Sequence, residues 1–135
     1  MEQPNSATPG GHPKRILLVE DDDAIANVYQ TRLQGEGFDV RRVSNGEEAL
    51  AAALNYHPDL VLLDIMMPKV SGFDVLDILR NTPETANLKI IMLTALSQDS
   101  DKERADSLGV DDYLVKSQVV IADVIDRIKY HLGIK

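Results

Sequence analysis

Five side chains, widely separated in the sequence, are the candidates for chemistry. They are three acids, a hydroxyl and an amine, namely Glu20, Asp21, Asp64, Thr94 and Lys116. Carboxylates held close together repel one another unless a cation compensates them. Mg²⁺ suits such a place, because it takes one or two protein carboxylates and fills its other positions with water and phosphate oxygens. Together with a hydroxyl and an ammonium group, the set would serve phosphoryl transfer to a carboxylate nucleophile, for which Asp64 is the natural acceptor.

Each candidate follows an aliphatic run that is typical of a buried strand. Leu60–Leu63 contains no polar residue, as in a central strand of a parallel sheet, and it runs directly into Asp64. The other runs end in the same way, in a group of acids, in Thr94 or in Lys116. The expected strands are Ile16–Val19, Phe38–Val43 at an edge of the sheet, Leu60–Leu63, Leu88–Leu93 and Tyr113–Val115.

Amphipathic segments alternate with these strands and predict five helices. Asp22 and Asp23 are expected to cap the first helix, and capping boxes are expected at Ser44–Glu47 and at Ser100 with Glu103. The fourth helix is so polar that it should lie loosely on the sheet. The apolar positions expected to face the sheet are Ile25, Val28, Tyr29 and Leu33, then Leu50 and Leu54, then Phe73, Leu76 and Leu79, then Ala105 and Leu108, and finally Ile121, Val124, Ile125, Ile128 and Leu132.

The alternation of strands and helices, joined by short loops, predicts an α/β fold with a doubly wound five-stranded parallel sheet covered on both faces. In such a sheet the carboxyl ends of all strands share one edge, and ligands bind at that edge. This geometry is the physical reason why residues from Glu20 to Lys116 can form one site without any local motif.

Composition limits the function classes. The 135 residues fit one domain, with no room for a second effector domain, and the absence of cysteine excludes disulfides, thiolate zinc sites and cysteine nucleophiles. A net charge of −8 argues against direct nucleic-acid binding and against anionic membrane surfaces. No apolar run is long enough to span a bilayer. The domain is expected to cover residues 14–135.

Residues 1–13 contain three prolines and almost no apolar side chain, and they are predicted to form a disordered N-terminal tail. The segment lacks the basic start and apolar middle of a secretory signal, so we expect a cytoplasmic protein. His57 and His131 are interpreted as surface residues without a chemical role.

Four separated motifs, in order, resemble the response-regulator receiver domain, the phosphoacceptor module of two-component signalling. They are Ile16–Asp22 with its acids, Leu62–Gly72 with Asp64, Pro68 and Gly72, Met92–Ala95 with Thr94, and Asp111–Lys116. The resemblance covers Lys14 to Leu132. It implies a flavodoxin-like (βα)5 fold with strand order 2-1-3-4-5.

The resemblance also implies a role for each site residue. Asp64 would accept a phosphoryl group from a histidine kinase or a histidine phosphotransfer protein. Asp21 would bind Mg²⁺ directly, Glu20 would bind it through water, and the main-chain carbonyl of Met66 would complete the protein ligands. Lys116 would pair with the phosphoryl group. The hydroxyl of Thr94 would move onto a phosphoryl oxygen, and Tyr113 would then turn inward as the switch aromatic.

The chain departs from the family pattern in two places. Family members usually carry a cis proline after the lysine, whereas this chain has Ser117, which predicts a trans Lys116–Ser117 bond with Ser117 drawn toward capping the last helix. Leu96 and Met66 are apolar where the family often has polar residues that tune loss of the phosphoryl group. Their bulk should hinder an attacking water and give a long-lived phosphorylated state.

Other readings remain open at this stage. A flavodoxin-like cofactor carrier shares the topology, but the acids after the first strand would repel its phosphate. A metal-dependent phosphatase would normally need a second carboxylate where this chain has Met66. A degenerate receiver that only binds proteins is favoured by Ser117 alone.

The resemblance implies a signalling domain that is not an enzyme in the ordinary sense, since it would catalyse only its own phosphorylation and dephosphorylation. The signal would appear on the surface formed by the fourth helix, fifth strand and fifth helix. The implied partners are the phosphodonor and a downstream effector protein or relay. The implied assembly is a monomer or a phosphorylation-dependent dimer.

Overall fold

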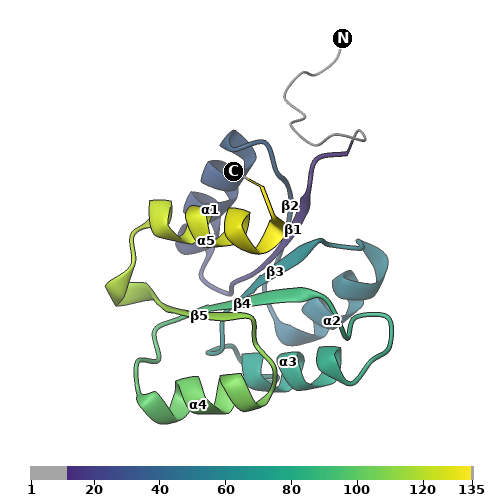
Figure 1. The fold of residues 1–135 in the computed structure, drawn as a ribbon, viewed down its shortest axis with the longest axis vertical. Helices are drawn as coiled ribbons and strands as arrows, with labels where there is room; N and C mark the ends of the chain where they lie inside the picture. The colour runs from purple at the N-terminus through teal and green to yellow at the C-terminus, as the bar shows by residue number, and fades with distance from the viewer. Residues whose placement is uncertain (1–11, 135) are drawn as a thin grey trace.

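The structure is a computed structural model, and it describes residues 12–134. Within these residues five strands alternate with five helices (Figure 1). Nearly all of the tail predicted for residues 1–13 lies outside the described residues. No helix within residues 12–134 has the length and apolar character needed to cross a bilayer. The elements are β1 (Arg15–Val19), α1 (Asp23–Gly35), β2 (Asp39–Val43), α2 (Gly46–Asn55), β3 (Leu60–Leu63), α3 (Gly72–Arg80), β4 (Lys89–Thr94), α4 (Asp99–Ser107), β5 (Asp112–Val115), the 3-10 turn η1 (Lys116–Gln118) and α5 (Ile121–Leu132).

The strands form one parallel sheet in the order β2-β1-β3-β4-β5. In the centre of the sheet, Val19 of β1 lies opposite Leu63 of β3, so the residues that follow these strands emerge side by side. This topology is the doubly wound, flavodoxin-like fold that was predicted, with the predicted strand order.

Two apolar layers hold the helices on the sheet. Successive strand residues point to opposite faces, so Leu17 and Leu63 face one layer and Leu18 and Leu62 face the other. Helices α2, α3 and α4 cover the first face, and α1 and α5 cover the second, as Figure 1 shows. The central strand β3 is buried throughout, in agreement with its unbroken aliphatic sequence.

The helical faces of α1 and α2 differ from the prediction. Val28 is 59% exposed and Leu54 is 45% exposed, although both were expected to face the sheet. Alanines pack there instead, with Ala26 buried in α1 and Ala49, Ala52 and Ala53 buried in α2. The helices therefore approach the sheet through small side chains. In α3 the predicted positions Phe73, Leu76 and Leu79 are buried.

The helix starts confirm one predicted cap and correct two. Asp22 caps α1 by accepting a hydrogen bond from the Ile25 amide, as expected. The cap of α2 is Asn45 rather than Ser44, because the Asn45 side chain accepts from the Glu48 amide. The capping box predicted at Ser100 is wrong, since α4 begins earlier, after Gln98, without a side-chain cap.

The peptide bonds of residues 12–134 contain no cis bond, and Lys116–Ser117 is therefore trans, as predicted. The predicted capping role of Ser117 is wrong. Ser117 lies in the 3-10 turn η1, whereas α5 begins after Val120. The carboxylate of Asp123 accepts the Val120 amide at 3.0 Å and serves the start of this helix instead.

Candidate functional site

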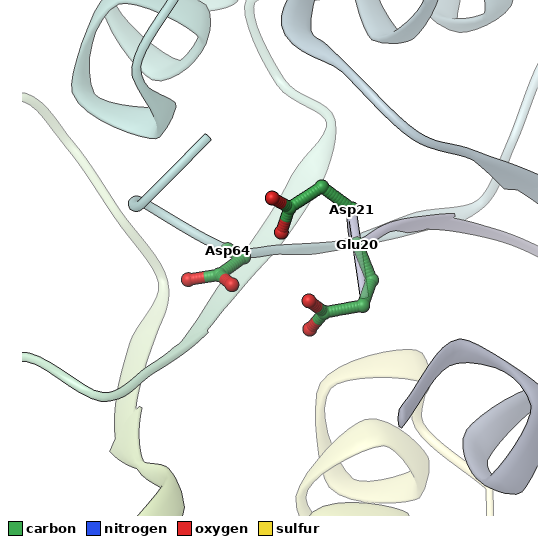
Figure 2. A group of neighbouring side chains, drawn as sticks. All are labelled: Glu20, Asp21 and Asp64. Carbon is green, nitrogen blue, oxygen red and sulfur yellow. The ribbon is translucent and has the colours of Figure 1, made fainter. Parts of the chain in front are cut away.

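Three carboxylates converge at the carboxyl edge of the sheet. Glu20 and Asp21 follow β1, and Asp64 follows β3 (Figure 2). One carboxylate oxygen from each of the three residues lies within 4.8 Å of the other two. The strand pairing continues into the site, because the Asp64 amide donates to the Val19 carbonyl at 3.1 Å. Adjacent strands, rather than a local loop, thus bring residues 20 and 64 together.

Burial gives these acids unequal environments. Glu20 is 4% exposed and Asp64 is 5% exposed, while Asp21 is exposed. Burial raises the pKa of Glu20 above its ordinary value, although a hydrogen bond from Lys116 opposes the shift. Buried acids of this kind need compensating positive charge, and a compact oxygen donor set with an exposed Asp21 fits the needs of Mg²⁺.

Lys116, the residue directly after β5, supplies a positive charge. Its ammonium nitrogen lies 2.8 Å from Oε1 of Glu20 and 3.1 Å from Oδ2 of Asp64. Burial alone would lower the pKa of Lys116, but the two carboxylates outweigh it and raise this pKa above its ordinary value. The amine therefore remains charged at neutral pH and bridges the acids of two different strands.

A glycine allows the loop after Asp64 to close tightly. The Gly72 amide donates to the Ile65 carbonyl at 2.9 Å, which brings the start of α3 against the end of β3. A Cβ atom at Gly72 would overlap the carbonyl oxygen of Asp64 and would lie 2.6 Å from Cα of Ile65. Only glycine permits this approach, which fixes the backbone that carries Asp64.

Thr94 and Tyr113 lie on the strands beyond β3. Thr94 ends β4 fully buried, and its hydroxyl accepts the Leu96 amide at 3.3 Å. Tyr113 is 9% exposed and its hydroxyl donates to the Leu96 carbonyl at 2.9 Å. Burial raises the pKa of Tyr113 to about 12. Both residues thus contact the same short segment, and both side chains are buried.

An open apolar hollow of about 530 Å³ borders one of the acids, Asp21. Asp21, Met66 and Leu96 are among its lining residues. Met66 is 55% exposed, and its amide donates to Oδ1 of Asp64 at 3.2 Å. The two apolar residues singled out in the sequence therefore flank one approach to the acids.

Sequence reasoning missed the contacts of three basic residues, one beside the site and two at the opposite, amino edge of the sheet. Arg42, on β2, contacts the Glu20 carbonyl, and Arg80 ties α3 to Gly109 and Asp111. His131 was interpreted as a surface residue, but it is half-buried and lies 2.9 Å from the Asp112 carboxylate. The sequence carries no signal for these contacts, because a basic residue on an edge strand or helix looks the same whether it is solvated or paired.

Comparisons with known proteins agree with this geometry. Residues 16–129 match the family model of the response regulator receiver domain. Over 102 residues the chain is 43% identical to the DNA-binding dual master transcriptional regulator RpaA of Synechocystis, which covers 76% of this chain and 42% of that protein. The chain thus spans less than half the length of this relative.

A second relative matches nearly end to end. The polar-differentiation response regulator DivK of Brucella anthropi is 33% identical over 121 residues, which is 90% of this chain and 98% of that protein. Among solved structures, a CheY-like receiver domain protein of Methanospirillum hungatei superposes with a TM-score of 0.84 at 30% identity, covering 90% and 95% of the two chains. The chain therefore belongs to the response-regulator receiver domain family of two-component signalling.

Proposed function

We propose that this domain is a working phosphoacceptor in which Asp64 takes a phosphoryl group from a histidine kinase or a histidine phosphotransfer protein. The observation that carries the proposal is the contact of the Lys116 ammonium with Asp64 and Glu20, beside a third acid. In the transfer, the bond between phosphorus and the donor nitrogen breaks. A new bond forms from phosphorus to a carboxylate oxygen of Asp64, and the electron pair leaves with the imidazole.

The surrounding groups supply positioning and charge. Asp21 would hold Mg²⁺ directly, Glu20 through water, and Met66 through its main-chain carbonyl. When bound, Mg²⁺ offsets the negative charge that gathers on the phosphoryl oxygens. Lys116 would move from its present carboxylate partners to a phosphoryl oxygen, because its mobile ammonium can serve either anion.

The hydroxyl of Thr94 would then donate to another phosphoryl oxygen and release its contact with the Leu96 amide. Since Tyr113 bonds to the carbonyl of the same Leu96, a shift of this segment would be felt at the Tyr113 ring. The altered surface would be that of α4, β5 and α5, which would bind a downstream effector protein or pass phosphate onward. Assembly would be monomeric or a phosphorylation-dependent dimer.

The phosphorylated state should be long-lived. Leu96 and Met66 line the approach to the acids with apolar groups, so they should disfavour a water positioned for attack on the acyl phosphate. The lifetime is measured by following the decay of radiolabelled protein after removal of the donor. Loss of the label within seconds would contradict this part of the proposal.

The decisive experiment is a titration with beryllium fluoride and Mg²⁺, together with mass measurement after exposure to acetyl phosphate. We expect saturable binding and a gain of one phosphoryl group, both abolished in Asp64→Asn. Asp74→Asn, an exposed acid in α3, is the matched control and should behave as the native protein. A native protein that shows neither response would instead be a degenerate receiver that acts only through protein binding.

A further inference from the structure

One arginine outside the proposed site contacts the peptide that joins two of its acids. Arg42 lies on β2, the edge strand next to β1. Its Nε and Nη2 atoms lie 2.9 Å and 2.7 Å from the main-chain carbonyl oxygen of Glu20. That carbonyl belongs to the peptide unit between Glu20 and Asp21. The guanidinium therefore donates hydrogen bonds to the peptide group that joins the two acids.

The remaining guanidinium nitrogen pairs with an exposed acid. Nη1 of Arg42 lies 2.9 Å from Oδ1 of Asp23, the first residue of α1. The Arg42 side chain is only 21% exposed, so its fork is partly shielded from competing water. One side chain therefore links the end of β1, the start of α1 and the strand β2.

The backbone alone does not supply this contact. The Glu20 amide donates to the Val43 carbonyl at 3.1 Å, which is the last bond of the β1 and β2 ladder. Because β2 ends at Val43, the ladder stops there, and the Glu20 carbonyl receives its donors from the Arg42 side chain. A lysine could not replace it fully, since a planar fork is needed to place two donors on one oxygen.

We infer that Arg42 is a positioning residue that orients Glu20 and Asp21 for Mg²⁺ through the peptide between them. The inference rests on the proposed function, because it assumes that these acids bind the metal. Groups that orient metal ligands from outside the ligand set typically change metal affinity by about 10-fold to 100-fold when removed. Loss of the arginine fork should therefore weaken Mg²⁺ binding by about 10-fold.

The test measures the Mg²⁺ dissociation constant by calorimetry in three variants that separate geometry from charge. Arg42→Lys keeps the charge but not the fork. The double variant Asp23→Ala with Arg42→Ala removes both members of the ion pair and leaves the net charge unchanged. Arg41→Ala removes an arginine from the neighbouring position, where its guanidinium lies over the Tyr56 ring at 4.6 Å.

We expect the first two variants to bind Mg²⁺ about 10-fold more weakly and Arg41→Ala to bind within about twofold of the native protein. Circular dichroism and the urea midpoint confirm that each variant is folded. Arg42→Gln replaces either Arg42 variant that is not. Native affinity in both Arg42 variants would overturn the inference while leaving the proposed function intact. A native protein that does not bind Mg²⁺ at all would overturn the proposed function as well.

Discussion

The ammonium of Lys116 donates a hydrogen bond of 2.8 Å to Oε1 of Glu20, which lies 96 positions earlier in the chain. The same ammonium reaches Asp64, so one amine pairs with acids that follow two different strands. A buried carboxylate without a partner is costly, so while both acids are buried the amine contributes to the stability of this edge of the sheet as well as to its chemistry.

Replacing this amine should expose that contribution. In Lys116→Met we expect the free energy of unfolding to fall by about 2–4 kcal/mol at neutral pH, because two buried carboxylates lose their cation. Urea unfolding with and without Mg²⁺ measures the change, and added metal should recover part of it by binding only the folded state. Lys102→Met is the control, since Lys102 pairs with Asp106 on the exposed surface of α4. Equal losses in the two variants would contradict the prediction.

The same amine should shape the alkaline limit of stability. The pKa of Lys116 is raised in the folded protein, so its contribution is present below the ordinary lysine value of about 10.4 and is lost as the pH rises through the higher folded value. Urea midpoints of the native protein should therefore approach those of Lys116→Met as the pH rises above about 10.4. A constant gap between the two proteins over this range would be inconsistent with the shift.

Gly72 should tolerate no side chain. In Gly72→Ala we expect a loss of about 1–3 kcal/mol, since the new Cβ would overlap the backbone of Asp64 and Ile65. The displaced Asp64 should also bind beryllium fluoride more weakly. Gly35→Ala, with no atom within 4 Å of the added Cβ, is expected to be neutral or slightly stabilising. Thermal and urea unfolding of both variants decide the matter.

The hydroxyl of Tyr113 should stabilise the segment that follows Thr94. We expect Tyr113→Phe to lose about 1 kcal/mol, the usual worth of one buried hydrogen bond, here the bond to the Leu96 carbonyl. Alkaline absorbance titration provides a second readout, because the native protein should show a tyrosinate step near pH 12 that shrinks in the variant. An unchanged titration would place the hydroxyl elsewhere.

Part of the protein's loss of stability at acidic pH should come from Asp112. Burial alone would raise the pKa of Asp112, but hydrogen bonds from His131 and Arg127 outweigh it and lower this pKa. Its contribution is therefore present above the ordinary value of about 3.9 and is lost as the pH falls through the lower folded value. Asp112→Asn should cost about 1–2 kcal/mol at neutral pH, with the gap closing in acid. Asp106→Asn, on the exposed face of α4, should show much smaller losses.

The sheet and the meeting of the acids were predictable because both depend on long-range pattern. Leu60–Leu63 is a strand with the bounds that its aliphatic sequence indicates. Parallel strands then bring Glu20, Asp64 and Lys116 to one edge whatever the loops do. Periodicity failed where small residues pack, since Ala26 replaces Val28 as the buried residue of α1.

Local polar contacts were less predictable. Asn45 and Ser44 are both good capping residues, and only the entry angle of the chain decides that Asn45 accepts the helix amide. Ser117 was expected to cap α5, but a 3-10 turn separates it from the helix. The contacts of Arg42 depend on which face of the edge strand β2 turns toward the site. The adjacent Arg41 points to the other face and lies over the Tyr56 ring instead.

The lysine of the site directly follows β5, the last strand in chain order. A chain still emerging from the ribosome carries Glu20, Asp21 and Asp64 well before it carries Lys116. Under the proposed chemistry, a fragment that stops short of position 116 lacks the cation that would pair with the phosphoryl group. The site is therefore completed only when the residue after the final strand has folded against the acids.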